Sequence, residues 1–248
     1  MNELNKPVHR SSECDLTKEP VFRGLPKESI AAIKRICRVR TYREGQTVIA
    51  DQTEPSFTGC IAEGILRMQK TLPDGRQHIV GLLVSHDMFG RVFHHRSNFD
   101  VEAATNARVC CFDRRALEDL LSRDAALERL FLVNVLDELD AAREWIILLG
   151  CRRVSERLAA FLLILCRRWT NVHGVLSGNA DRIRVHVPIG RADLANYLGT
   201  RPETISRAVH ALADDGVIAI HDSQTFDILN LPRLVATAGN GGFGLERP

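Results

Sequence analysis

The chain has 248 residues, of which 45% are hydrophobic and 26% charged, and this length predicts two domains joined by a connecting element. No apolar run approaches the roughly 18 residues that a membrane span needs. Residues 1–10 also lack the apolar core of a secretion signal, so we expect a cytoplasmic protein that has no membrane partner. The formal net charge of +2 is too small to identify a nucleic acid as a partner.

The chain contains seven cysteines, and only Cys110 and Cys111 are adjacent. Their odd number and irregular spacing suggest neither a disulfide framework nor a zinc ribbon. Because we expect a protein that is not exported, we interpret all seven as reduced thiols. Cys60, Cys151 and Cys166 have apolar or helical surroundings and are expected in the core.

The N-terminal half has the pattern of a β-rich domain. Residues 1–20 are polar and predict an arm without regular structure, and residues 26–39 have helical spacing. From residue 39 to residue 115 short β-type runs alternate with turns, and Pro73-Asp-Gly75 is one such turn. The clearest runs are residues 46–49, 65–68 and 78–83. Short strands with regular turns favour a sandwich or a barrel.

Helical spacing replaces the strand pattern between residues 115 and 169. The apolar positions at three- and four-residue spacing are Leu127, Leu130, Phe131, Val135, Leu139, Trp145, Ile146 and Leu149. The stretch 130–149 is apolar on more than one face, which is too much for a helix that covers one small domain. Either two copies of this helix cover each other in a dimer, or its apolar residues pack within one chain. Periodicity alone leaves both alternatives open.

The last hundred residues, approximately, hold a concentration of arginines and a more specific pattern. A second amphipathic helix follows Gly150 and runs from residue 154 to residue 169. Residues 182–187 alternate like a strand, and residues 217–220 and 226–229 predict a small β-hairpin. Residues 239–248 read as a frayed tail.

Between these elements, residues 190–212 predict two short helices on either side of Gly199. Pro202 suits the first position of the second helix. The inward-facing residues are Leu194, Ala195 and Leu198 on the first helix and Ile205, Val209 and Leu212 on the second. This arrangement is typical of a helix-turn-helix.

The second helix carries Glu203, Ser206 and Arg207 on one polar face, because they are spaced i, i+3 and i+4. An arginine can bind guanine with two hydrogen bonds, and a glutamate can accept one from cytosine. Thr200, Arg201 and Thr204 lie near the helix start, where they suit phosphate contacts. The alternative is a solvated helix whose Glu203 and Arg207 pair with each other, worth about 0.2–0.5 kcal/mol.

Six short segments together carry a family resemblance. Glu203-Thr-Ile-Ser-Arg207 follows Asp193-Leu-Ala-Asn-Tyr-Leu-Gly199, and Glu156-Arg-Leu-Ala-Ala-Phe161 precedes both. Upstream lie Arg43-Glu-Gly-Gln-Thr47, Leu72-Pro-Asp-Gly-Arg-Gln77 and Asp87-Met-Phe-Gly90. These segments resemble the CRP/FNR superfamily, and the FNR/FixK branch in particular, over roughly residues 20–235.

The resemblance implies an α+β fold and favours the dimer. Its parts would be an arm at 1–20, a β-roll (cupin-like jelly roll) sensor domain at 21–124, a dimerisation helix at 125–151, a winged helix-turn-helix at 152–238 and a tail at 239–248. The resemblance further implies a homodimeric activator of microaerobic or anaerobic metabolism genes that contacts RNA polymerase. In this family the motif residues that correspond to Glu203, Ser206 and Arg207 read a TTGA-type half-site, so we expect double-stranded DNA with a palindrome such as TTGAT-N4-ATCAA.

The expected sensor domain departs from the patterns of the family that it resembles. Cyclic-nucleotide-binding members carry a glutamate after Phe-Gly and then an arginine, whereas this chain has Arg91 after Phe89-Gly90 and acidic residues further on. This charge pattern argues against a cyclic nucleotide, although Arg91 or Arg96 can meet another small anion.

Two metal cofactors are further alternatives for the sensor. A [4Fe-4S] cluster needs three closely spaced N-terminal cysteines and a fourth in the β-roll; Cys110 or Cys111 matches the fourth, but only Cys14 lies in the arm. Haem could use His86, His94 or His95, which share a loop. A regulator that acts without any effector fits equally well.

An enzyme or ligand-binding barrel is the alternative from a different class. The sequence has no nucleophile elbow, phosphate-binding loop, HExxH or dinucleotide-binding glycine motif. We therefore expect no enzymatic activity.

Overall fold

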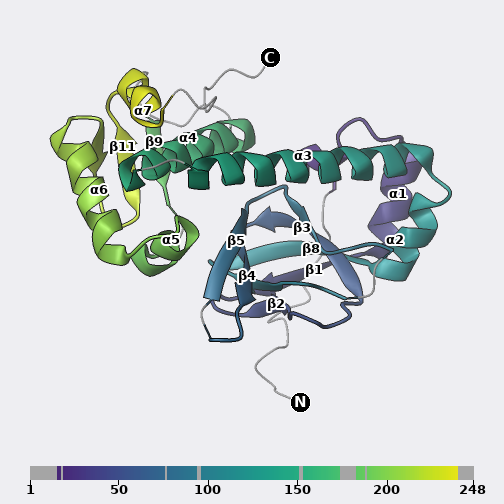
Figure 1. The fold of residues 1–248 in the computed structure, drawn as a ribbon. Coiled ribbons are helices and arrows are strands. Elements are labelled where there is room, and N and C mark those ends of the chain that lie inside the picture. The colour runs from purple at the N-terminus through teal and green to yellow at the C-terminus, as the bar shows by residue number, and fades with distance from the viewer. Residues whose placement is uncertain are drawn as a thin grey trace. The chain divides into compact units, whose positions relative to one another are not determined.

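The computed structural model describes residues 16–239, except residues 18, 76, 94–95, 151–152, 174–182 and 188, and the side chains of residues 167–173. The chain forms two compact units, Met1–Asp140 and Ala141–Pro248 (Figure 1).

The first unit is built on two antiparallel four-stranded sheets, with strand orders β1-β8-β3-β6 and β2-β7-β4-β5. The strands are β1 Cys37–Tyr42, β2 Thr47–Ile49, β3 Phe57–Glu63, β4 Leu66–Thr71, β5 Gln77–Leu83, β6 Met88–Phe89, β7 Asp100–Ala103 and β8 Ala107–Asp113. Both sheets send apolar side chains into one core, including Ile61 and Val109 from the first sheet and Leu66 and Val101 from the second. The β-roll that the resemblance implied is therefore present.

A second core covers the outer face of the β1-β8-β3 sheet. It lies against the 3-10 helix Pro20–Phe22, α1 Lys27–Ile36 and α2 Arg114–Leu121. Phe22 meets Phe112 of β8 edge to face, with 5.8 Å between the ring centroids. Leu16 is only 1% exposed, so the arm expected to lack structure up to residue 20 already packs at residue 16.

The first helix ends earlier than its sequence spacing predicted. Residues 37–39 belong to β1, where Cys37 and Val39 are buried and Arg38 is exposed. Cys37 pairs with Phe112 of β8, so the backbone N–H and C=O groups of this segment find their hydrogen-bond partners in the sheet and not in a longer helix. The periodicity could not reveal this, because an alternation over three residues is too short to distinguish a strand from a helix.

α3 is a single helix that runs from Ala125 to Gly150. It begins after Asp124, whose Oδ1 accepts hydrogen bonds from the backbone N–H groups of Ala126 and Leu127, both at 3.1 Å. Its large exposed apolar side chains are Leu132, Val133, Val135, Leu136, Leu139, Ile146, Ile147 and Leu149. Within the described part of the chain, no helix is sufficiently long and apolar to span a membrane.

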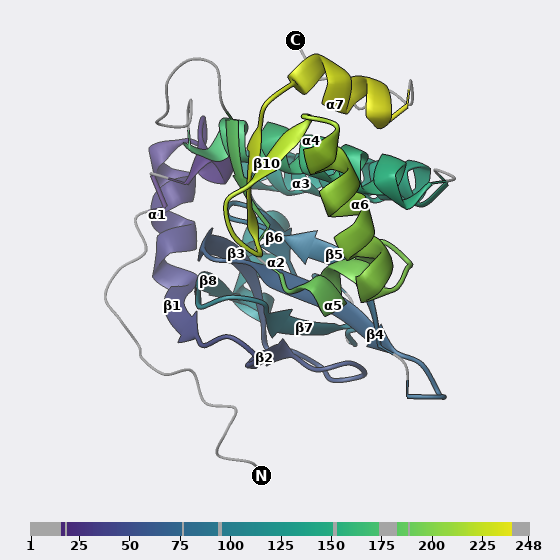
Figure 2. The same ribbon diagram turned by 90° about the vertical axis from the view of Figure 1, so that its left-hand side faces the viewer.

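The second unit surrounds α4, Val154–His173, whose Leu158 and Leu162 are completely buried. Its other elements are β9 Ile183–His186, α5 Arg191–Tyr197, α6 Pro202–Asp214, β10 Ile218–Ile220, β11 Thr225–Ile228 and α7 Leu231–Thr237. The strands form an antiparallel sheet in the order β10-β11-β9, and Figure 2 shows β10 beside α6. The predicted hairpin and the predicted strand before the helix-turn-helix are both confirmed.

Candidate nucleic-acid interface

α5 and α6 form a helix-turn-helix around Gly199, as the sequence predicted. Gly199 has φ +61°, a left-handed conformation that a side chain disfavours. The turn is closed by a 2.8 Å hydrogen bond from the Thr200 N–H to the Ala195 carbonyl. The side chains predicted to face inward are all buried, so one face of each helix is fixed against the core. These are Leu194, Ala195, Leu198, Ile205, Val209 and Leu212.

The opposite face of α6 carries the residues that we expect to read bases. Arg201 is the N-cap residue, and Pro202 holds the first helical position. Glu203 and Arg207 are exposed, while Ser206 is half-buried. The helix therefore presents these three side chains on one side, away from its buried apolar stripe.

Glu203 and Arg207 do not pair with each other. Among the ion pairs between described residues, none joins these two side chains, although their spacing allows one. The guanidinium of Arg207 instead donates to the hydroxyl of Thr204 at 3.5 Å, the upper limit of a hydrogen bond. The solvated-pair alternative is therefore not what this helix adopts, and Arg207 stays available to a ligand.

Two residues of the helix-turn-helix were not proposed as site residues from the sequence. His210 is exposed on α6 one turn after Ser206, at a position that sequence spacing already places on the same face. Arg191 begins α5 and lies over the ring of Phe226, 5.3 Å from its centroid. Partial burial there lowers the pKa of Arg191. Only the tertiary contact with Phe226 distinguishes Arg191 from the other arginines of this region.

The β10–β11 hairpin is a compact loop held by side chains. Asp222 Oδ1 accepts hydrogen bonds from the backbone N–H groups of Gln224 and Thr225, both at 2.7 Å, and these bonds lower the pKa of Asp222. Arg184 of β9 binds Asp227 of β11 through two bonds of 2.7 and 3.1 Å. The unit therefore has a hairpin after its recognition helix, as a winged helix does.

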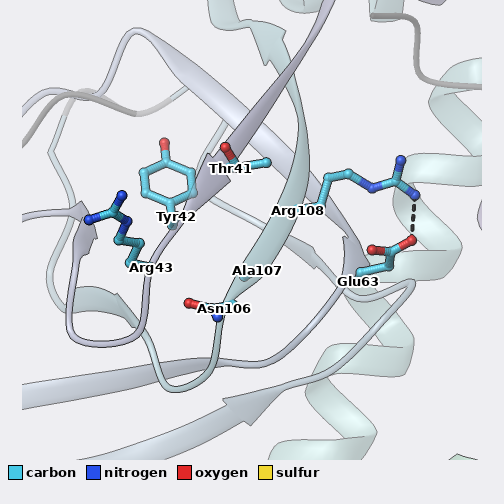
Figure 3. Close-up of a pocket in the computed structure, with 7 residues that line it drawn as sticks. All are labelled: Thr41, Tyr42, Arg43, Glu63, Asn106, Ala107 and Arg108. Carbon is cyan, nitrogen blue, oxygen red and sulfur yellow. Dashed lines mark hydrogen bonds and ion pairs between the residues drawn. The ribbon is translucent and has the colours of Figure 1, made fainter. Parts of the chain in front are cut away.

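The β-roll places its candidate anion-binding arginines in solvent. Arg91 and Arg96 are both exposed. A hollow of about 370 Å³ lies elsewhere, and its lining residues are Thr41, Tyr42, Arg43, Glu63, Asn106, Ala107 and Arg108. In Figure 3, Arg43 points away from Arg108, whose guanidinium binds Glu63 at 2.6 Å. These arginines do not converge on a common anion.

Cys110 and Cys111 lie on opposite faces of β8. Cys111 faces the core between the two sheets, and Cys110 faces the outer core near α1. Burial raises the pKa of Cys111 to about 12. Cys110 is disulfide-bonded, so the expectation of seven reduced thiols is wrong there. Cys60 and Cys166 are buried, as predicted.

The described residues contain no group of three or more His, Cys, Asp or Glu side chains arranged to hold a metal ion. Cys14 and Cys151 lie outside the described residues, as do His94 and His95. His86 is held by Glu19, whose carboxylate lies 2.7 Å from Nδ1.

Comparisons with known proteins agree with this geometry. Residues 156–237 match the model of the Crp-like helix-turn-helix domain, and residues 39–124 match that of the cyclic nucleotide-binding domain. The transcriptional activator protein FnrL of Cereibacter sphaeroides is 34% identical over 244 residues, which cover 98% of each chain. The nitrogen fixation regulation protein FixK of Bradyrhizobium diazoefficiens is 32% identical over 86% of this chain and 87% of its own.

Among solved structures, FixK2 from Bradyrhizobium japonicum matches with a TM-score of 0.72 and 26% identity, over 82% of this chain and 97% of that one. The β-roll and the helix-turn-helix with its hairpin define a DNA-binding transcription regulator. The chain belongs to the CRP/FNR family, in its FNR/FixK branch, which is a family of regulators and not of enzymes.

Proposed function

We propose that this protein is a homodimeric transcription activator that reads a palindrome of the type TTGAT-N4-ATCAA through α6. The observation that carries the proposal is the exposed polar face of α6, with Glu203 and Arg207 exposed and not paired with each other. A recognition helix lies in the major groove with its N-terminal residues on the base edges. The name of FnrL, a transcriptional activator protein, supports the role in activation, and family resemblance supports microaerobic or anaerobic genes as targets.

The residues at the start and on the exposed face of α6 would make two kinds of contact with DNA, to bases and to phosphates. Glu203, Ser206 and Arg207 would contact bases, with Arg207 giving the guanine contact that two hydrogen bonds make specific. Thr200, Arg201 and Thr204 would hold phosphates at the start of α6, where the backbone N–H groups also favour anions. Phosphate contacts set the position of the helix, and base contacts set the sequence preference.

The dimer would form through α3. Leu132, Leu136, Leu139 and Ile146 recur at spacings of four, three and seven residues, and they are 57%, 51%, 44% and 68% exposed. Four large apolar side chains in one helical stripe are costly in water and are typical of a surface that a second copy covers. A second copy of α3 offers the same stripe, so the contact is self-complementary.

The sensor would not need a nucleotide or a metal to permit DNA binding. Apolar side chains from both sheets fill the core between them, and Arg91 is exposed rather than turned toward a common site. Effector-gated regulation through a [4Fe-4S] cluster, haem or a small anion is the alternative, with Cys14, Cys110, Cys111 and Arg91 as its candidate residues. RNA polymerase is the proposed partner at the promoter.

The test is binding of the purified full-length protein to a TTGAT-N4-ATCAA duplex and to a scrambled duplex, at stated salt because phosphate contacts make affinity salt-dependent. Aerobic and anaerobic preparations should bind the palindrome equally. Binding only without oxygen would favour the cluster, and no specific binding in either preparation would contradict the proposed site. Sedimentation should give a dimer, and Leu136→Glu should shift it toward monomer.

Matched substitutions separate the two kinds of contact. Arg207→Ala should lose about 1–3 kcal/mol of binding and relax the preference at one base pair. Arg201→Ala should weaken binding to all sequences alike and reduce the salt dependence by about one phosphate contact. Equal losses on palindrome and scrambled duplex from both variants would contradict the base-reading role of Arg207.

A further inference from the structure

Three aromatic side chains meet where the last turns of α3 reach the helix-turn-helix. Trp145 of α3 stacks on Tyr197, the last residue of α5, with 3.6 Å between the ring centroids and 18° between the ring planes. Phe161 of α4 meets the same tyrosine edge to face, at 5.6 Å and 72°. Tyr197 is therefore held between two helices that lie outside the helix-turn-helix.

Other contacts extend this junction to the turn itself. Leu148, one turn after Trp145, is completely buried. A methyl group placed on Gly199 would lie 3.9 Å from Leu149 Cδ2 and 3.8 Å from the Arg157 guanidinium. The end of α3 thus packs against the first helix of the DNA-binding motif and its turn, whereas the base-reading face of α6 takes no part in the junction.

We propose that the stack of Trp145 on Tyr197 is the joint that fixes the orientation of the helix-turn-helix on the end of α3. The inference rests on the proposed function, because in a dimer held by α3 this orientation sets the distance between the two recognition helices. Trp145 is then a positioning residue that determines which spacing between half-sites the dimer accepts. Two flat rings in contact resist tilting and sliding, and the edge contact of Phe161 blocks rotation of the tyrosine.

The preference for one spacing between half-sites distinguishes a positioning role of Trp145 from a role in stability alone. Each base pair inserted between half-sites moves one half-site by about 3.4 Å and rotates it by about one-tenth of a turn. A rigid joint makes the dimer reject such changes, and a loose joint tolerates them. A variant that is merely less stable loses the same factor on every spacing.

The experiment compares full-length wild type, Trp145→Leu and Trp145→Phe on duplexes with spacers of three, four and five base pairs, and on a duplex with one half-site. We expect Trp145→Leu to reduce the preference for the best spacer by about three- to tenfold, the range that one aromatic pair supports. Affinity for the single half-site should stay unchanged. Trp145→Phe and Tyr197→Phe each keep two stacked rings, so these variants should retain most of the wild-type preference for the best spacer.

Fluorescence provides a second readout that does not depend on DNA. The chain has two tryptophans, so Trp169→Phe leaves Trp145 as the only one. Tyr197→Leu in that background should raise the acrylamide quenching of Trp145 while the circular dichroism spectrum stays the same.

If Trp145→Leu lost the same factor of affinity on all spacers while the wild type stayed selective, the positioning role of Trp145 would be wrong and the proposed function would stand. Unchanged acrylamide quenching of Trp145 in the Tyr197→Leu variant would likewise contradict the stacking of the two rings. A wild type without specific binding to any spacer would overturn the proposed function and the joint with it.

Discussion

Asp124 caps the helix that we propose as the dimer interface, and its removal tests how that helix starts. Asp124→Ala deletes the acceptor of two backbone N–H groups at 3.1 Å and a hydrogen bond with the buried side chain of Ser29. Loss of such a cap costs about 0.5–2 kcal/mol, and a buried hydroxyl left without its partner adds about 1 kcal/mol. We therefore expect the Ala variant to be less stable by about 2 kcal/mol.

Asp124→Asn is the matched control, because asparagine caps a helix as well but carries no charge. It should lose only the attraction between the carboxylate and the helix N-terminus, about 0.3–1 kcal/mol. The hydrogen bond with Ser29, followed by those from the backbone, holds the pKa of Asp124 below its usual value of 3.8. The stabilisation is therefore complete above pH 3.8 and is lost as the pH falls through the lower pKa of the folded state.

The assay is urea unfolding followed by circular dichroism, with hydrogen exchange at residues 125–131 as the local readout. At pH 7 the order of stability should be wild type, Asn, Ala, with the fastest exchange in the Ala variant. The difference between wild type and Asn should stay constant from pH 7 to pH 5 and shrink below pH 4. An Ala variant within 0.3 kcal/mol of wild type, with unchanged exchange, would refute the capping argument.

Two further predictions concern the turn and the thiols. A Cβ on Gly199 would have no atom closer than 3.8 Å, so Gly199→Ala should lower the free energy of unfolding by about 1 kcal/mol through its positive φ alone. Gly199→Asn should lower it less, because asparagine tolerates a positive φ better. Thermal unfolding compares the two variants, and an equal loss in both would indicate a steric clash instead. Burial raises the pKa of Cys37, Cys111 and Cys166 to about 12, so only about 10⁻⁴ of each thiol is ionised at pH 8. A colorimetric thiol reagent should therefore leave all three untouched in the native protein and react after unfolding; rapid reaction in the native state would show that these cysteines are accessible.

Much of the DNA-binding unit was predictable because its contacts are local in sequence. The apolar spacing around Gly199 fixed two helices and the face that each buries, and the same spacing put Glu203, Ser206 and Arg207 on the opposite side. A helix forces residues three and four apart onto one side, so this part of the site follows from the order of residues.

In the β-roll, burial depends on contacts that no local pattern in the sequence predicts. Adjacent cysteines at 110 and 111 look like a single candidate site, but a strand turns neighbouring side chains to opposite faces, and each belongs to a different core. The burial of Leu16 and Glu19 likewise depends on residues far along the chain, among them Phe112 of β8 near Leu16 and His86 beside Glu19.

The sequence by itself determined the family, the order of the elements and the polar face of α6, because periodic spacing and short motifs encode them locally. Only the tertiary structure decided that Trp145 stacks on Tyr197, that Arg191 lies over Phe226, and that β1 begins at Cys37. Each of these joins residues about 35 to 75 positions apart, and such contacts depend on how elements pack together, which no local pattern specifies.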